Sequence, residues 1–275
     1  MNRPAKLRGI AVHDAGGDAP PVLCLHGIGS SGSGFGALSR LLAGRLRLIA
    51  WDAPGYAASD DPPGAPGTDG YADAAAGVLD DLGIARASVL GTSWGGVIAT
   101  RFALRHPDRL DALVLADSTR GSGTAPAKAA AMRARAAELA ERGPAEFARA
   151  RAPRLLSPGA SPADVARVAE AMAAAIRLPG YGHAAESMAA TDHGDAFARI
   201  TAPTLVLVGE HDAVCPPAES RLIAASVPGA RYAEIPGAGH LAHQERPEAF
   251  AGAVRDFLLP RSPAVPRSDA EENPS

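Results

Sequence analysis

The sequence contains little of what several classes of protein require. Among its 275 residues there are two cysteines, 4% aromatic residues and a formal net charge of only −3. A weak net charge gives no electrostatic basis for binding nucleic acid or an anionic membrane, and scarce aromatics argue against a surface on which bases stack. Cys24 and Cys215 form no Cys-x-x-Cys pair, so we expect two small buried residues, although the sequence leaves a disulfide between them open.

The sequence also shows no segment of the kind that directs a chain to a membrane. No apolar run is long enough to span a bilayer, and the basic residues 1–10 lack the apolar stretch of a secretory signal. We therefore expect a cytoplasmic protein without membrane contact. The hydrophobic fraction of 47% suffices for one sizeable core. Residues 261–275 are rich in proline, serine and acidic residues and are expected to form a disordered tail.

Short β-type runs alternate with helical stretches along most of the chain, which is the pattern of a mostly parallel sheet covered by helices. Several runs are apolar without alternation, as in strands that are buried on both faces. The clearest runs are residues 22–25, 46–51, 88–90, 113–116, 204–208 and 231–235. Each run ends in a Gly, Asp or Ser cluster. The loops at the carboxyl ends of parallel strands are where such sheets place their chemistry.

Residues 119–199 interrupt this rhythm. They are rich in Ala, Arg and Glu, contain no strand candidate, and are divided by Gly-Pro, Ser-Pro-Gly and Pro-Gly breaks. They therefore predict a helical insertion, or cap, between two strands of a core that is made of residues 1–118 and 200–260.

A nucleophile motif follows the third of these runs. Gly91-Thr92-Ser93-Trp94-Gly95 has the Gly-x-Ser-x-Gly spacing, directly after a strand and directly before a helical stretch. Glycines flank the serine because a very sharp strand-to-helix turn leaves no room for side chains there. Such a turn presents the hydroxyl near the positive end of the helix. We interpret Ser93 as the nucleophile of a hydrolase.

A serine hydroxyl needs a general base, and the base needs an acid that orients it. Asp212 follows the run 204–208 and His240 follows the run 231–235, so both lie at carboxyl ends of strands, as Ser93 does. The chain order of serine, acid and histidine is one of those known for such triads. We therefore predict that Ser93, Asp212 and His240 act together.

Two other carboxylates compete for the role of the acid. Asp117 follows the run 113–116. Some proteins with this chain order take the acid from that strand, which makes Asp117 the main alternative. Glu210 lies nearer the end of its own strand and is expected to support the turn. Asp212 is preferred, and Asp117 stays open.

Two other histidines compete for the role of the base. His243 lies one turn beyond His240, where a helix begins, and is expected to pack or to cap. His211 adjoins the acid but follows no turn flexed by glycine, so we assign it a surface or supporting role. The spacing of the histidines offers no set of metal ligands, and no metal is expected.

Acyl transfer also needs hydrogen-bond donors that point at the developing oxyanion. One is expected from the backbone N–H of Trp94, the residue after the nucleophile. The other is expected from the N–H of Ile28, in the Gly-rich loop that follows the run 22–25. His26 is expected to hold this loop by hydrogen bonding.

The same loop also has the spacing of a dinucleotide-binding fingerprint. Gly27, Gly29 and Gly32 read Gly-x-Gly-x-x-Gly, and Asp52 lies twenty positions after Gly32. Two features argue against a dinucleotide. The Gly- and Ser-rich run continues to residue 36 and leaves no clean helix start, and a dinucleotide would leave the serine, acid and histidine unexplained. We expect no nicotinamide, flavin or other cofactor.

With these residues identified, the sequence resembles the α/β-hydrolase superfamily over about residues 8–259. The matching segments, in the family's order, are LHGIGSSG, WDAPGYAASD, GTSWGG, LVLVGEHDAVCPP and IPGAGHLAHQERPEAF. The last one resembles the subgroup of 3-oxoadipate enol-lactonases, meta-cleavage product hydrolases and cofactor-free haloperoxidase-like esterases. The resemblance implies an α/β fold with a mostly parallel eight-stranded sheet, flanking helices, and a helical cap inserted after the sixth strand.

The resemblance implies a reaction class more clearly than a substrate. We predict hydrolysis of a small carboxylic ester or lactone through an acyl-enzyme. The alternatives are a C–C bond hydrolase of meta-cleavage-type diketones and a non-hydrolytic receptor, cyclase or lyase. A small molecule is the partner we expect, and a homodimer is left open.

Contacts with the substrate are predicted for a few side chains. Trp94 is expected to line the acyl pocket, and Arg120 and His183 are candidates for further contacts. Several arginines of the insertion could pair with a substrate carboxylate or simply face solvent. These are Arg120, Arg151, Arg154 and Arg177. His193 is expected to be structural or exposed.

Overall fold

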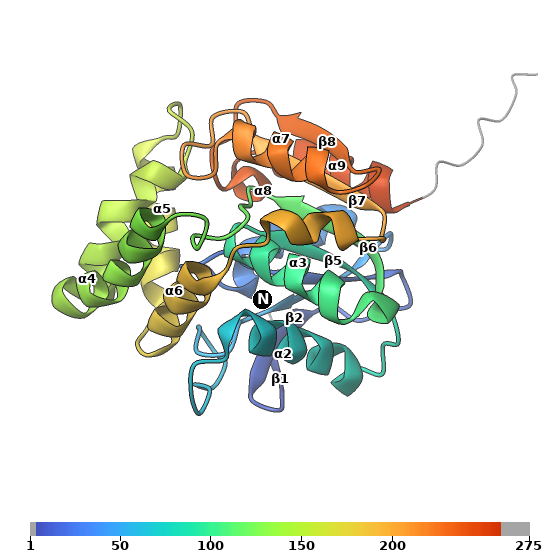
Figure 1. The fold of residues 1–275 in the computed structure, drawn as a ribbon, viewed down its shortest axis with the longest axis horizontal. Helices are drawn as coiled ribbons and strands as arrows, with labels where there is room; N and C mark the ends of the chain where they lie inside the picture. The colour runs from blue at the N-terminus through green and yellow to red at the C-terminus, as the bar shows by residue number, and fades with distance from the viewer. Residues whose placement is uncertain (1–3, 260–275) are drawn as a thin grey trace, which may run out of the picture.

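The computed structural model describes residues 4–259 as an α/β fold around one eight-stranded sheet (Figure 1). The strands are β1 (Ala5–Leu7), β2 (Ile10–Asp14), β3 (Pro21–Leu25), β4 (Arg47–Trp51), β5 (Ala87–Thr92), β6 (Leu110–Ala116), β7 (Thr204–Gly209) and β8 (Arg231–Ile235). Their spatial order is β1-β2-β4-β3-β5-β6-β7-β8. Pairs that involve β1 or β2 are antiparallel, and all other pairs are parallel. The predicted fold class is confirmed, and the predicted tail at 261–275 lies outside the described residues.

All six β-type runs of the sequence are strands, whereas β1 and β2 gave no clear pattern. β1 is a three-residue edge strand with largely exposed side chains. It turns into β2 through Arg8 and Gly9, which both have positive φ. β2 then joins the sheet through antiparallel pairing with β4, where Val12 lies opposite Trp51. A short exposed hairpin lacks the buried apolar run that marks the central strands.

The sheet is covered by helices on both faces. Along β3, Leu23 and Leu25 belong to one buried cluster, whereas Val22 and Cys24 belong to the other, because successive side chains of a strand point to opposite faces. The first face is covered by α2 (Gly67–Asp81), α3 (Trp94–Arg105) and α7 (Pro217–Ser226). The second is covered by α1 (Gly36–Leu42) and α9 (Pro247–Leu258), with the short α8 (Ala242–Glu245) before it.

A helical insertion separates β6 from β7, where the sequence predicts it. It contains α4 (Pro126–Arg151), α5 (Pro162–Ala175) and α6 (Gly180–Ala190), together with the short 3-10 helices η3 (Ala152–Leu155) and η4 (Gly194–Arg199). In Figure 1 the three α-helices gather at one side of the sheet. α4 is kinked at Gly143, which has a φ of +70°. Phe147, Met172 and Met188 of the insertion share a buried cluster with the core helices α2 and α3, so the insertion packs directly on the core.

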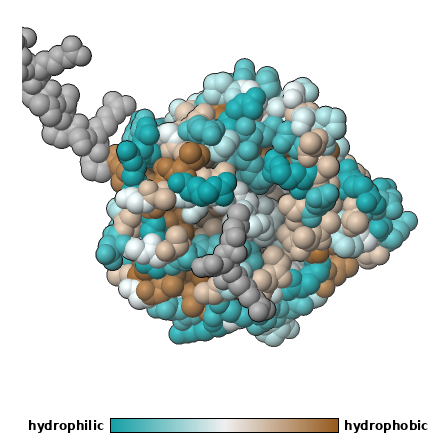
Figure 2. Space-filling view, turned by 180° about the vertical axis from the view of Figure 1, so that it is seen from behind, coloured by the Kyte–Doolittle hydropathy of each residue, from teal (hydrophilic) through white to brown (hydrophobic). Residues whose placement is uncertain are grey.

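The surface is mixed in character. The face shown in Figure 2 is predominantly hydrophilic, and its apolar residues lie in separate patches. Within residues 4–259, no helix combines the length and the apolar character needed to cross a bilayer.

Both cysteines are buried and carry free thiols, so the disulfide that the sequence left open is not formed.

Candidate active site

Ser93 occupies the turn between β5 and α3, where its backbone has a φ of +53° and a ψ of −118°. A positive φ is sterically costly for a residue with a Cβ. A Cβ on Gly91 would lie 2.2 Å from the carbonyl oxygen of Gly95, and a Cβ on Gly95 would lie 2.0 Å from that of Leu25. Neither position can therefore hold a side chain. Strand and helix approach closely, and the Ser93 side chain projects from the turn between them.

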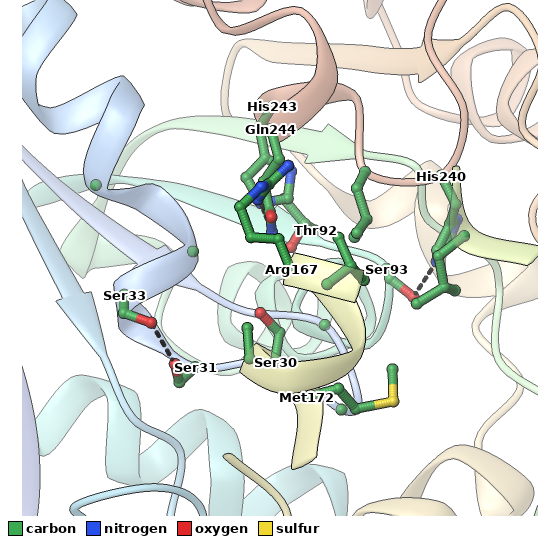
Figure 3. A pocket seen from close by; sticks show the side chains of 18 of the residues that line it. Ser30, Ser31, Ser33, Thr92, Ser93, Arg167, Met172, His240, His243 and Gln244 are labelled. Carbon is green, nitrogen blue, oxygen red and sulfur yellow. Dashed lines mark hydrogen bonds between the residues drawn. The ribbon is translucent and has the colours of Figure 1, made fainter. Parts of the chain in front are cut away.

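Three side chains from distant loops form a hydrogen-bonded chain at this turn. His240 Nε2 lies 3.0 Å from Ser93 Oγ, and His240 Nδ1 lies 2.8 Å from Asp212 Oδ2 (Figure 3 shows the first of these contacts). The other carboxylate oxygen of Asp212 accepts hydrogen bonds from the backbone N–H groups of Val214 and Cys215, both at 2.8 Å. The structure thus brings together the three residues that the sequence predicts to act together.

The surroundings of His240 favour the protonated form of its ring. Burial lowers the pKa of His240, but the hydrogen bond and the charge of Asp212 outweigh burial. The pKa of His240 therefore lies above its ordinary value. Because Asp212 binds the Nδ1 side, the Nε2 lone pair of a neutral ring points at the Ser93 hydroxyl.

Asp117, the alternative acid, lies buried behind this chain. Its Oδ1 accepts a hydrogen bond from the N–H of Gly209 at 2.8 Å, and its backbone has a φ of +49°. Burial raises the pKa of Asp117 to about 8, so this carboxyl holds its proton at neutral pH. Among residues 4–259, His240 has its carboxylate hydrogen bond with Asp212 alone. The geometry favours Asp212 over Asp117 as the partner of His240.

The other competing residues have structural surroundings. Glu210 accepts a hydrogen bond from the N–H of Gly237 at 2.9 Å and so supports the turn after β8. His243 is buried between Phe35 and Phe250. Burial lowers the pKa of His243 to about 3, which leaves the ring neutral. The side chain of His211 is 45% exposed, which places it on the surface rather than in the hydrogen-bonded chain.

The Gly-rich loop after β3 lies directly against the turn that holds Ser93. A Cβ on Gly27 would lie 3.1 Å from the Cβ of Ser93. His26 contacts the carbonyl oxygen of Gly27 through Nδ1 at 2.9 Å and accepts from the N–H of Ala53 through Nε2 at 3.0 Å. Burial lowers the pKa of His26 to about 4, so a neutral ring makes both contacts. The loop is thereby held with Ile28 beside Ser93.

Asp52, the acidic residue of the dinucleotide fingerprint, is engaged in hydrogen bonds within the protein. Asp52 accepts hydrogen bonds from the backbone N–H groups of Gly32 at 2.9 Å and Ala58 at 3.1 Å, and it also contacts His13 at 3.3 Å. A ribose would have to compete with these contacts. The Gly-x-Gly-x-x-Gly spacing therefore shapes the loop beside Ser93, and its acid fastens that loop to the chain after β4.

Two cavities open onto Ser93, one of about 350 Å³ and one of about 320 Å³. The first lies between the Gly-rich loop, α5 and the segment that contains His243 and Gln244 (Figure 3). The second extends under the insertion. The residues that line both cavities are Ile28, Ser93, Leu155, Met172 and His240. Ser93 therefore stands at the junction of the two cavities.

The second cavity is strongly cationic. Lys128, Arg135, Arg151 and Arg154 all line it. The carboxylate in its lining, Glu219, is already bound to Arg120 at 2.9 Å.

Arg135 and Arg154 are the guanidinium groups of this cavity without an ion pair among residues 4–259, and Arg135 is the more buried of the two. Arg151 is paired with Glu138 at 2.6 Å, whereas Arg135 has no ion pair among residues 4–259 and is half-buried. Burial and the charges of Arg151 and Arg154 lower the pKa of Arg135. This cavity can therefore attract an anionic group of a bound molecule.

One group of ligand-type atoms lies close together in the described part of the chain. Asp212, Cys215 and His240 each place such an atom within 4.8 Å of the others. Two of these residues are already committed to their mutual hydrogen bond. Burial raises the pKa of the Cys215 thiol well above its usual range, which keeps it protonated and a poor metal ligand. The donor set fits hydrogen bonding better than metal binding.

Comparison with known proteins agrees with this architecture. Residues 20–247 match the family model described as alpha/beta hydrolase fold. The chain belongs to the α/β hydrolase family. It is 31% identical to the 2-hydroxy-6-oxononadienedioate/2-hydroxy-6-oxononatrienedioate hydrolase of Cupriavidus pinatubonensis. The alignment spans 264 residues and covers 90% of each chain. It is also 32% identical to the putative non-heme bromoperoxidase BpoC of Mycobacterium tuberculosis. This alignment spans 263 residues and covers 90% of this chain and 96% of that protein.

A solved member of the family has the same fold. The enol-lactonase of Burkholderia xenovorans LB400 superposes with a TM-score of 0.80 at 28% identity, covering 93% of this chain and 99% of the other. Enol-lactonases, meta-cleavage hydrolases and non-heme bromoperoxidases are thus all among the relatives. The resemblance to this α/β hydrolase subgroup, predicted from the sequence, is confirmed.

Three substrate contacts predicted from the sequence are not supported by where the side chains lie in this α/β hydrolase. The indole of Trp94 is fully buried and lines neither cavity, because it packs under the insertion. Arg120 is held by Glu219, and its side chain is absent from both linings. His183 is half-buried in α6 and also lines neither cavity.

Two further residues of the insertion have structural partners. Arg177 binds Asp61 and the backbone carbonyls of Ala57 and Ser59. His193 lies 3.1 Å from the carbonyl oxygen of Val97 through Nε2. The expectation that His193 is structural agrees with this contact.

The sequence also missed lining residues. Arg151 and Arg154 line the cationic cavity, but Arg135 and Lys128 were not among the candidates. No local pattern marks Arg135 among the arginines of α4. Its role depends on how α4 lies against η3 and α6.

Proposed function

We propose that the protein is a serine hydrolase of small carboxylic esters or lactones. The observation that carries the proposal is the hydrogen-bonded chain from Ser93 Oγ through His240 to Asp212, at a strained turn beside the Gly-rich loop. A nucleophile, a base and an orienting acid within hydrogen-bond distance are what acyl transfer requires.

The proposed reaction proceeds in two halves. Ser93 Oγ attacks the carbonyl carbon while its proton passes to His240 Nε2, and Asp212 stabilises the charged ring. The N–H groups of Ile28 and Trp94 bind the oxyanion of the tetrahedral intermediate. This intermediate expels the alkoxide, which takes the proton from His240 and leaves an acyl-enzyme. Water, deprotonated by His240, then attacks the acyl carbon and releases the acid and the free serine.

The cationic cavity bears on the choice of substrate. An ester or lactone with a carboxylate at one end would place that group near Arg135, where a charge-assisted hydrogen bond is available. An enol-lactonase among the structural relatives supports the lactone as a substrate class.

A second candidate is hydrolysis of a C–C bond in a vinylogous diketone that carries a carboxylate. The same cationic cavity favours it, as does the relative whose name describes a dioate hydrolase. The two reactions differ in the bond that is broken, and separate substrates distinguish them.

The test combines active-site labelling with a substrate panel. A fluorophosphonate should label the wild type at one site per chain, and Ser93→Ala should abolish both the label and the hydrolysis of p-nitrophenyl esters and lactones. Ser226→Ala is the matched control, because Ser226 lies exposed on α7 and should keep full labelling. A chromogenic dienoate reports on C–C cleavage. An unlabelled wild type would refute the proposal and favour a non-hydrolytic receptor, cyclase or lyase.

A further inference from the structure

Trp94 connects two regions of the molecule that the reaction needs. Its backbone is the first residue of α3, directly after Ser93. Its indole is fully buried, and Nε1 donates a hydrogen bond of 3.0 Å to Ser187 Oγ on α6. The ring also packs edge-on against Tyr71, with 4.8 Å between the ring centroids, and lies 6.1 Å from the ring of His26. One side chain thus contacts the insertion, α2 and the Gly-rich loop.

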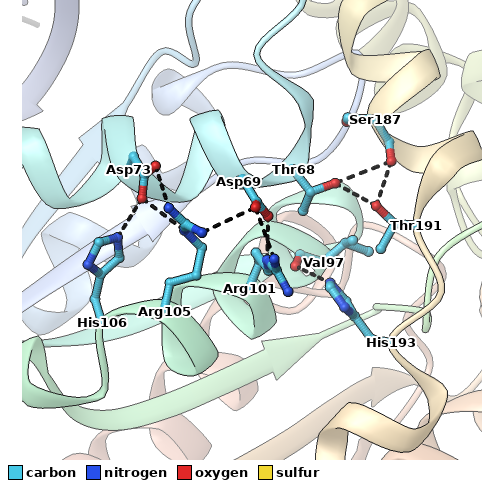
Figure 4. Close-up of polar contacts among 10 residues, drawn as sticks. All are labelled: Thr68, Asp69, Asp73, Val97, Arg101, Arg105, His106, Ser187, Thr191 and His193. Carbon is cyan, nitrogen blue, oxygen red and sulfur yellow. Dashed lines mark hydrogen bonds and ion pairs between the residues drawn. The ribbon is translucent and has the colours of Figure 1, made fainter.

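Ser187 is held in place by further hydrogen bonds. Its Oγ donates to the carbonyl oxygen of Ala184 at 2.8 Å and is therefore the acceptor for Trp94. Its carbonyl oxygen accepts from the hydroxyls of Thr191 at 2.6 Å and Thr68 at 3.3 Å (Figure 4). Trp94 Nε1, Ser187 Oγ and the hydroxyls of Thr68 and Thr191 all have hydrogen-bond partners, which fixes the acceptor for the indole.

A second contact ties the insertion to the same helix. His193 Nε2 lies 3.1 Å from the carbonyl oxygen of Val97, one turn along α3 from Trp94 (Figure 4). Burial lowers the pKa of His193, so the neutral ring is the species that donates here. The end of the insertion is therefore fastened to the first turn of the nucleophile's helix at two points.

The same helix of the insertion also borders the cationic cavity. Tyr181 and Met188 of α6 line that cavity, and Met188 is the neighbour of Ser187 in the chain. A group that fills the cavity contacts α6 through Tyr181 and Met188, while Ser187, about 100° around the helix from Met188, binds the indole of Trp94. Because this region is close-packed, a shift of α6 is passed to its neighbours rather than absorbed.

We propose that Trp94 is a positioning residue, whose indole couples the occupancy of the cationic cavity through α6 to the alignment of its own backbone N–H. This inference rests on the proposed function, in which that N–H stabilises the oxyanion. Substrates that fill the cavity then align the donor, and poorly fitting substrates leave it less well aligned. The effect falls on kcat, because the oxyanion forms only after binding.

The test exploits the two tryptophans of the chain. Trp94→Phe keeps an aromatic ring but removes the N–H that Ser187 accepts. Trp51→Phe is the matched control, because Trp51 is also fully buried but its Nε1 has no partner within residues 4–259. We expect kcat per fluorophosphonate-labelled site to fall roughly tenfold in Trp94→Phe, with KM changed less than about twofold. The control should keep the wild-type kcat.

Ser187→Ala removes the acceptor and should lower kcat by a similar factor. The double variant should lose no more than Trp94→Phe alone, because both changes break one interaction. Full labelling with an unchanged kcat in Trp94→Phe would overturn the coupling, as would losses that multiply in the double variant. A wild type that does not label at all would instead refute the proposed function, so the two failures are distinguishable.

Fluorescence supplies a readout that a purely structural contact would not change. In Trp51→Phe, Trp94 is the one remaining tryptophan. Phosphonates that modify Ser93 with either a methyl group or a long carboxylate-bearing arm should give different emission maxima, because only the long arm reaches the cavity beside α6. Identical spectra for the two adducts would contradict the coupling.

Discussion

Arg135 is the residue whose substitution tests the substrate preference most directly. It is half-buried, lines the cationic cavity, and lacks an ion pair among the described residues, whereas Arg151 is already paired with Glu138. A bound carboxylate would therefore gain a charged partner that has no ion pair among residues 4–259. Arg135→Gln removes the charge and keeps a polar side chain of smaller volume.

The size of the effect follows from the kind of bond lost. A hydrogen bond between charged partners contributes about 1.5–3 kcal/mol, and each 1.4 kcal/mol is about tenfold in binding or rate. The value for two charges 4 Å apart at an effective dielectric of 20, about 4 kcal/mol, is an upper limit. The expected loss in kcat/KM is thus roughly 10-fold to 100-fold for an anionic substrate.

The assay compares two esters of equal chain length. We expect Arg135→Gln to lose that factor on p-nitrophenyl hemiglutarate and to lose less than about threefold on p-nitrophenyl pentanoate, because only the first carries a carboxylate. The ratio of kcat/KM between the wild type and Arg135→Gln on the anionic ester should also decrease as salt is added, because salt screens the charge interaction. Arg149→Gln is the control, since Arg149 lies exposed on the same helix and lines neither cavity.

The stability of the variant gives an independent check. Arg135 shares its cavity with Lys128, Arg151 and Arg154, so removing its charge relieves repulsion. Arg135→Gln should therefore unfold at a temperature no lower than the wild type. Equal losses on both esters would refute the reasoning, because they would show that Arg135 shapes the site without recognising charge.

Further predictions concern the acids around the histidine. Asp212→Asn should lower kcat by roughly 10³-fold to 10⁴-fold, whereas Asp117→Asn should keep most activity at pH 7. In the wild type, kcat/KM should fall as pH drops through a pKa above the ordinary histidine value, since protonated His240 cannot accept the serine proton; a pH–rate profile of Asp212→Asn should show that pKa lowered. Burial raises the pKa of Asp117 from 3.8 to about 8, so the folded state holds a proton that the unfolded chain releases. This group therefore costs stability increasingly as pH rises between these two values. The Tm of Asp117→Asn relative to that of the wild type should rise from about pH 4 to pH 8 and stay constant above that. A constant difference in Tm would contradict the raised pKa.

The turn that holds Ser93 and the loops that hold Asp212 and His240 could be located from the sequence alone. Gly91 and Gly95 mark a turn that no larger residue can occupy, and the contacts of 2.2 and 2.0 Å explain why. Parallel strands bring their carboxyl ends to one edge of the sheet, so residues after β5, β7 and β8 had to converge. The chain order then selected Ser93, Asp212 and His240. These inferences need only local sequence and the rules of strand topology.

Other features depended on packing between distant segments. The direction of the Trp94 indole was predicted wrongly, because a helix-start residue can face the substrate or the core, and here Ser187 on α6 supplies an acceptor in the core. Asp117 and Asp212 both follow strands, and only their placement shows that one binds His240 while the other is buried beside Gly209.

The lining of the cationic cavity also depended on packing between distant segments. The arginines of the insertion were visible as a composition, but a helix carries arginines on every side, and most of them face solvent or an acid. Arg120 is bound by Glu219 and Arg177 by Asp61, whereas Arg135 and Arg151, on either side of the kink in α4, both line the cavity. The sequence by itself determined that Ser93, Asp212 and His240 come together, because close steric approach and strand order constrain their positions. Only the tertiary structure decided which charged side chains share a cavity with Ser93, because that depends on how the helices of the insertion pack.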